Sequence, residues 1–133
     1  SVTEVEAAIL GFARAGLRVH ITEVDLDVLP QISDYTGADI STNYKYAQKL
    51  NPYTAGLPES IEAQHTKRYT ELFQLFVKHR DKIDRISTWG TTDGESWKNG
   101  WPIKGRTNYP LLFDRGYRPK PAYFSIKDLK LQS

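Results

Sequence analysis

Two carboxylates stand two positions apart where an apolar segment ends. Glu23 and Asp25 lie near the end of the stretch 17–26, which opens with residues typical of a buried strand. Side chains alternate between the faces of a strand, so this pair is predicted to share a face. At the carboxyl end of a parallel strand, such a pair would lie where α/β folds place ligands and catalytic groups. A strand that runs out into a solvated acidic loop is the alternative, because charged residues are usually exposed.

A second candidate feature is the clustering of tryptophan. All three tryptophans fall between Trp89 and Trp101, in a segment rich in Gly and Asp. Tryptophan usually belongs to a core, but three in such a segment favour a surface that stacks on a flat ligand. Asp93 and Glu95 lie in the same segment, and nothing in the sequence distinguishes either as a proton donor.

The histidines are assigned structural positions. His65 is interpreted as a helix-face residue, and His79 as a favourable cation near a helix end. His20 lies three residues before Glu23, so it is expected on the opposite face of the strand, packed rather than catalytic. The sequence shows no ligand cluster for a metal, and no cofactor is expected.

Composition narrows the classes of function. The chain has 133 residues, enough for one modest domain, and its 18 basic and 16 acidic residues give a net charge of +2. This balance gives no support for nucleic-acid binding. Cysteine is absent, and the apolar runs are too short for a membrane span. No signal peptide is visible at the start.

The candidate residues must be positioned by alternating helices and strands. A helix with a capping box at Thr3 and Glu6 is expected to close at Gly16, immediately before the strand. The stretch 30–58 is predicted to be a long loop, functional or without a role, with a short helix near 44–50.

The second half of the chain continues the alternation. Apolar residues at helical spacing predict a long helix from residue 61, followed by a strand at 83–89. Pro121 suits the first turn of a last helix at about 122–129. Two parallel strands leave unpaired edges, so the pattern indicates part of a larger parallel sheet or barrel. A (β/α)8 barrel needs about 250 residues.

Three motifs occur in order along the chain. They are Val-His-Ile-Thr-Glu-Val-Asp-Leu at 19–26, Ser-Thr-Trp-Gly-Thr-Thr-Asp-Gly-Glu-Ser-Trp at 87–97, and Tyr-Pro-Leu-Leu-Phe-Asp-Arg at 109–115 with Lys-Pro-Ala-Tyr at 120–123. Together they resemble glycoside hydrolase family 10, the retaining endo-β-1,4-xylanases. The first motif resembles the strand that carries the nucleophile of that family, the second its last strand and following loop, and the third its C-terminal signature.

The resemblance implies an α/β fold, with residues 1–133 as the C-terminal part of a single (β/α)8 TIM barrel, from about helix 6 through strands 7 and 8 to helix 8. By position, Glu23 would be the catalytic nucleophile. Asp25 would be a supporting acid, which in this family is partnered by a histidine from an earlier strand of the barrel, outside residues 1–133. Trp89 and Trp97 would wall the subsite of the sugar whose bond is cut. Secretion to the periplasm or the extracellular space is also implied.

The acid/base glutamate of the family belongs to the earlier half of the barrel. We therefore expect the chain alone to be inactive on xylan or xylo-oligosaccharides, and to require the N-terminal half of the barrel as a second chain. A non-catalytic carbohydrate-binding piece and a purely structural fragment are the alternatives. No nucleic acid or membrane partner is expected.

Overall fold

The structure is a computed structural model, and it describes residues 1–30, 49–101 and 104–129. The predicted order of helix, strand, helix, strand and helix is confirmed. The elements are α1 (Val2–Arg14), β1 (Val19–Val24), α3 (Glu59–Lys78), β2 (Ile83–Thr88), the 3-10 helices η2 (Asp93–Glu95) and η3 (Trp97–Asn99), and α4 (Pro121–Lys127). Most of the short helix expected near 44–50 lies outside the described residues.

Helix α1 begins two residues earlier than its predicted capping box. The Ser1 hydroxyl accepts the backbone N–H of Glu4 at 3.3 Å, and the Glu4 carboxylate returns to the Ser1 amino group at 2.6 Å. The box at Thr3 and Glu6 is therefore wrong, because Glu6 instead contacts both Lys78 and His79 at 2.7 Å. Gly16 has a φ of 78°, as expected of a residue that closes a helix.

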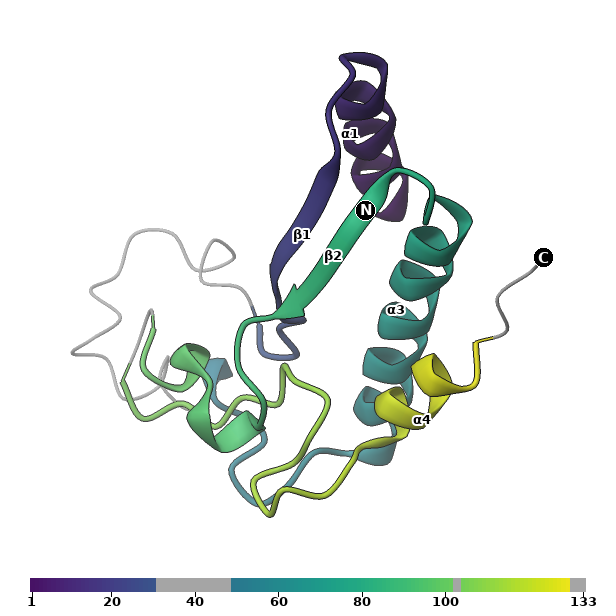
Figure 1. The fold of residues 1–133 in the computed structure, drawn as a ribbon. Helices are drawn as coiled ribbons and strands as arrows, with labels where there is room; N and C mark the ends of the chain where they lie inside the picture. The colour runs from purple at the N-terminus through teal and green to yellow at the C-terminus, as the bar shows by residue number, and fades with distance from the viewer. Residues whose placement is uncertain (31–48, 102–103, 130–133) are drawn as a thin grey trace.

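The two strands form a parallel pair whose carboxyl ends point toward η2 and η3 (Figure 1). The register joins Val19 to Ile83 and Val24 to Thr88, with irregular pairing between Ile21 and Val24. Beyond the strands, the backbone N–H of Trp89 donates to the carbonyl of Val24 at 3.2 Å. The first residue after β2 is thus fixed directly against the end of β1.

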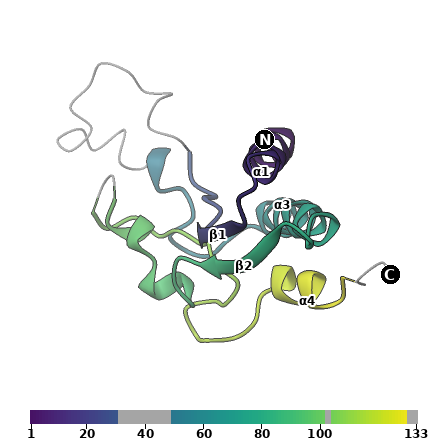
Figure 2. The same cartoon turned by 45° about the horizontal axis from the view of Figure 1, so that its top comes forward.

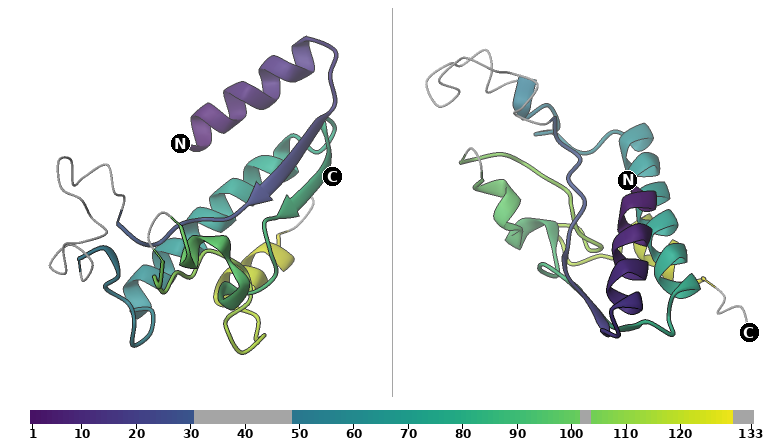
Figure 3. Two further views of the ribbon diagram at one scale, coloured as in Figure 1. Left: turned by 90° about the vertical axis from the view of Figure 1, so that its left-hand side faces the viewer. Right: turned by 90° about the horizontal axis from the view of Figure 1, so that it is seen from above.

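The helices cover one face of the sheet, as Figures 2 and 3 show. One buried cluster joins α1, β1 and α3, and a second joins β1, α3 and α4. Their buried members are Ile9, Val19, Leu75 and Phe76 in the first cluster, and Val24, Tyr69 and Ala122 in the second. Burial of these side chains holds the carboxyl ends of both strands on a fixed scaffold.

The opposite face of β1 is not covered by the described residues. Val19 and Ile21 pack toward the helices, so His20 between them points away. The His20 side chain is 56% exposed and lies 3.8 Å from a carboxylate oxygen of Asp84. The prediction that His20 is packed is therefore wrong, and because His20 and Glu23 are both exposed, the burial does not place them on opposite faces of the strand.

Helices α3 and α4 begin at prolines or just after them and meet through hydroxyl groups. Pro58 precedes α3, and Pro121 occupies the first turn of α4 as expected. The Thr70 and Ser125 hydroxyls are 2.5 Å apart across the helix pair. No helix in the described ranges is long and apolar enough to cross a membrane.

Candidate active site

Glu23 lies at the irregular end of β1 with an unusual backbone. Its φ of 61° belongs to the left-handed region, which costs a side-chain-bearing residue about 1–3 kcal/mol. The side chain is exposed. The simple alternation that would place Glu23 and Asp25 on one face does not continue through this residue, because a left-handed residue interrupts the pleat. Such strain is common at functional sites.

Asp25 is held by the loop that follows β2. Its carboxylate is 10% exposed. One oxygen accepts the indole N–H of Trp97 at 2.9 Å, and the other lies 3.4 Å from the ammonium of Lys98. The structure therefore brings Asp25 and Trp97 together, across 72 positions of sequence.

A third carboxylate, Asp27, extends this group. It lies 3.7 Å from the ammonium of Lys98, and it accepts the side-chain N–H of Asn108 at 2.8 Å. Asp27, Lys98 and Asn108 were not predicted as site residues. The two-residue spacing of the carboxylates was a signal for Asp27, whereas Lys98 and Asn108 are brought close only by the fold of the loop.

All three tryptophans are exposed in the part of the chain that the structure describes. Trp89, Trp97 and Trp101 are 49%, 45% and 62% exposed. Trp89 directly follows β2, and Trp97 opens η3. Exposed indoles at the end of a parallel sheet can stack on the apolar face of a sugar ring.

A buried ion pair fixes the tryptophan loop to the start of α4. Asp93 is fully buried, and it accepts from the Lys120 ammonium at 3.0 Å and from the Leu111 backbone N–H at 2.9 Å. Lys120 also donates to the carbonyls of Tyr109 and Leu111. Burial raises the pKa of Asp93 and lowers the pKa of Lys120, and the charge of each partner opposes this shift. Asp93 thus anchors the loop.

Glu95, by contrast, lies on the loop surface. Its carboxylate accepts the hydroxyl of Tyr117 at 3.3 Å. Nothing in this contact distinguishes Glu95 as a proton donor.

His65 is buried in α3, as a helix-face residue should be. It is 2% exposed, and neither ring nitrogen has a hydrogen-bond partner. Burial, together with the nearby charge of Lys120, lowers the pKa of His65 to about 3. It is therefore a neutral core residue at pH 7.

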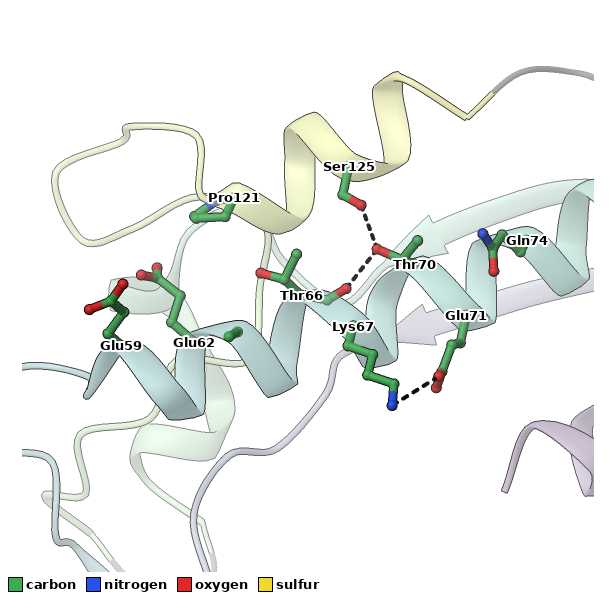
Figure 4. Close-up of a pocket in the computed structure, with 10 residues that line it drawn as sticks. Glu59, Glu62, Thr66, Lys67, Thr70, Glu71, Gln74, Pro121 and Ser125 are labelled. Atoms are coloured by element: carbon green, nitrogen blue, oxygen red, sulfur yellow. Dashed lines mark hydrogen bonds and ion pairs between the residues drawn. The ribbon is translucent and has the colours of Figure 1, made fainter.

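One hollow formed by described residues is not lined by the predicted site residues. A hollow of about 680 Å³ lies between α3 and α4, lined by Glu59, Glu62, Thr66 and Lys67 among others (Figure 4). None of Glu23, Asp25, Trp89 or Trp97 lines it. In the part of the chain that the structure describes, no group of three or more His, Asp or Glu side chains is placed to hold a metal ion.

A parallel strand pair covered by helices on one face, with carboxylates and exposed tryptophans at the carboxyl ends of the strands, has its candidate residues where α/β barrel enzymes carry their active sites. The sequence profile of Glycosyl hydrolase family 10 matches residues 1–129. The chain belongs to this family, whose members and solved structures imply a (β/α)8 barrel, and it represents a partial piece of that barrel.

Individual relatives agree with the family assignment. Endo-1,4-beta-xylanase A of Xylanibacter ruminicola is 44% identical over 126 residues, which are 95% of this chain. A GH10 endoxylanase from a sugarcane soil metagenome shares 50% identity over 96% of the chain, with a TM-score of 0.85. Xylanase B from Clostridium stercorarium F9 shares 33% identity over 97% of the chain, with a TM-score of 0.76.

The chain is much shorter than these relatives. It spans 34% of the Xylanibacter ruminicola enzyme, and 35% and 33% of the two solved structures. The relatives named above are described as xylanases, and this chain corresponds to about a third of the length of each.

Proposed function

We propose that this chain supplies the nucleophile side of a retaining endo-β-1,4-xylanase and forms the barrel segment from about helix 6 to helix 8. Strand β1 would be strand 7 of the barrel, and β2 would be strand 8. The observation that carries the proposal is the contact of Trp97 with Asp25, two residues after the exposed Glu23. It joins a carboxylate strand end to an indole surface suited to sugar.

Glu23 is the nucleophile in this proposal. Its carboxylate oxygen attacks the anomeric carbon while the glycosidic C–O bond breaks, and the leaving oxygen takes a proton from a second carboxylic acid. Water then cleaves the ester to Glu23, and the second residue takes back a proton. In retaining enzymes the two carboxyl groups stand about 5–5.5 Å apart.

Asp25 and the tryptophans support this chemistry without performing it. Asp25 accepts the Trp97 indole N–H, which orients the ring beside the strand end. Trp89 follows β2 and is fixed through its backbone to Val24. The two rings would wall the subsite that holds the sugar undergoing cleavage.

The acid/base residue must come from the preceding part of the barrel. We propose the N-terminal half, acting as a second chain, as the partner that completes the site. Xylan or xylo-oligosaccharides are the proposed substrates, in an extracellular or periplasmic location. The isolated chain is expected to be inactive.

The test is Glu23→Ala in the barrel completed by its N-terminal half. Loss of the nucleophile should lower kcat on xylan by more than about 10³-fold, while binding of xylo-oligosaccharides by calorimetry stays measurable. Glu71→Ala, on the outer side of α3, is the matched control and should retain activity. Turnover retained by the Glu23 variant would reject this residue as the nucleophile.

The exposure of all three tryptophans also favours a second candidate, a carbohydrate-binding fragment without catalysis. In that case the chain alone would bind xylan. Binding that is unchanged in Trp89→Ala and Trp97→Ala variants would reject this alternative. A purely structural fragment would show neither binding nor complementation.

A further inference from the structure

Lys98 is the charged residue at the strand ends to which neither the sequence motifs nor the proposed chemistry assigns a role. It follows Trp97 within η3, and its side chain is only 17% exposed. Its ammonium lies 3.4 Å from Asp25, 3.7 Å from Asp27 and 4.9 Å from the centre of the Trp97 ring. One cation therefore touches two carboxylates of the β1 end and the indole that hydrogen-bonds to one of them.

These contacts are stronger than those of an ordinary surface lysine. The side chains of Asp25 and Asp27 are 10% and 21% exposed, so solvent screens their attraction to Lys98 less than at a free surface. Without a cation, the two carboxylates would repel each other. A cation above an indole face is also attracted by the electrons of the ring.

The other groups that contact Asp27 do not bring a positive charge to its carboxylate. Asn108 donates a neutral N–H to Asp27 at 2.8 Å, and Arg68 reaches only the backbone carbonyl of Asp27, at 3.4 Å. Among the ion pairs of the described residues, Asp25 and Asp27 pair with Lys98 alone.

We propose that Lys98 is a positioning residue that clamps the Trp97 ring against Asp25 and thereby sets the affinity of the sugar subsite. This proposal rests on the proposed function, because it assigns Trp97 to a sugar. Lys98 acts through Trp97 and does not touch the scissile bond. Its loss should therefore weaken substrate binding more than the chemical step.

The experiment compares Lys98→Met and Lys98→Arg in the completed barrel. Methionine keeps the length of the side chain without its charge, whereas arginine keeps the charge and can stack on the ring. We expect Lys98→Met to raise KM for xylo-oligosaccharides about tenfold, with kcat within about threefold of the original. Lys98→Arg should keep most of the affinity of the original protein for xylo-oligosaccharides. Lys82→Met, which also loses an ion pair but lies before the amino end of β2, should change neither constant.

A second readout does not depend on hydrolysis. The indole N–H resonance of Trp97, assigned with a Trp97→Phe variant, should move in Lys98→Met and stay in place in Lys82→Met. An unmoved resonance in Lys98→Met would overturn the clamp, as would a fall in kcat with unchanged KM. If the completed barrel does not cleave xylan but the resonance moves, the clamp stands and the proposed function fails.

Discussion

At the scale of single residues, the structure separates groups suited to chemistry from groups that belong to the core. Asp25 is largely covered, yet its partners are an indole N–H and an ammonium, so it stays in a polar environment. His65 is covered by α3 and its neighbours without any hydrogen bond. Burial alone therefore does not distinguish a site residue from a core residue. The hydrogen-bond and ion-pair partners of the buried group make that distinction.

His65 should make stability depend on pH. Its pKa is about 3 in the folded protein and about 6.5 when unfolded, so the unfolded state binds the extra proton between these values. The stabilisation from neutral His65 is fully present above pH 6.5. It is lost as pH falls, by about 1.4 kcal/mol per pH unit.

The measurement is the urea midpoint of the completed barrel between pH 7 and pH 4. The free energy of unfolding obtained from these curves should fall less steeply with pH in a His65→Leu variant, which removes the buried ring nitrogens. The difference in slope between the two proteins should be about 1.4 kcal/mol per pH unit. Equal slopes for His65→Leu and the original protein would contradict the assignment. Gln74→Leu, at an exposed position of the same helix without a titrating side chain, serves as the control and should keep the original slope.

At the scale of elements, the connection from β2 to α4 is held by one buried ion pair. Lys120 directly precedes α4, and its ammonium contacts the carboxylate of Asp93 and the carbonyls of Tyr109 and Leu111. The tryptophan loop is thereby fixed at its base. Replacing only one partner would leave a buried group without compensation.

Lys120→Met should therefore destabilise the completed barrel by about 3 kcal/mol, because the carboxylate of Asp93 is left buried and unpaired. The double variant Asp93→Asn/Lys120→Met should lose less than the sum of the two single variants. Urea unfolding of all three variants measures the coupling. Additive losses would show that the pair contributes nothing as a pair, and Lys127→Met, on the exposed side of α4, is the control.

The sequence was sufficient for the elements but not for the contacts between them. Helical spacing from Ile61 to Val77 and the proline at 121 predicted α3 and α4, and each predicted end lies within about two residues of the observed end. These predictions succeed because periodicity and caps are local signals. The left-handed backbone of Glu23 was not predictable, since it arises where the pairing of β1 becomes irregular. The Asp25 contacts depend on a loop far along the chain.

At the scale of the whole molecule, the described residues form two strands covered on one face only. A two-stranded sheet is marginal by itself. The exposed His20 and the outer edges of both strands are surfaces that a complete (β/α)8 barrel covers with its other strands. This agrees with a chain that spans about a third of its relatives.

Mixing the chain with its matching N-terminal barrel half should therefore give a 1:1 complex that releases sugars from xylan, whereas each half alone should not. Sedimentation and a reducing-sugar assay measure the two outcomes, with the Glu23→Ala chain as an inactive control that still forms the complex. Failure of both activity and complex formation would reject the partner proposal.

The hydrogen bond from the Trp89 N–H to the Val24 carbonyl has a consequence for exchanging loops between relatives. This bond is the last rung between neighbouring strands, whose spacing of about 4.8 Å is set by peptide geometry. The position of the Trp89 backbone relative to Val24, the residue after Glu23, is thus set by the backbone hydrogen bond and not by the side chains. We call this relative position the offset. Chimeras that replace the loop beyond Gly90 with that of a related endo-1,4-β-xylanase should preserve this offset, so the loop can be exchanged without rebuilding the end of β1.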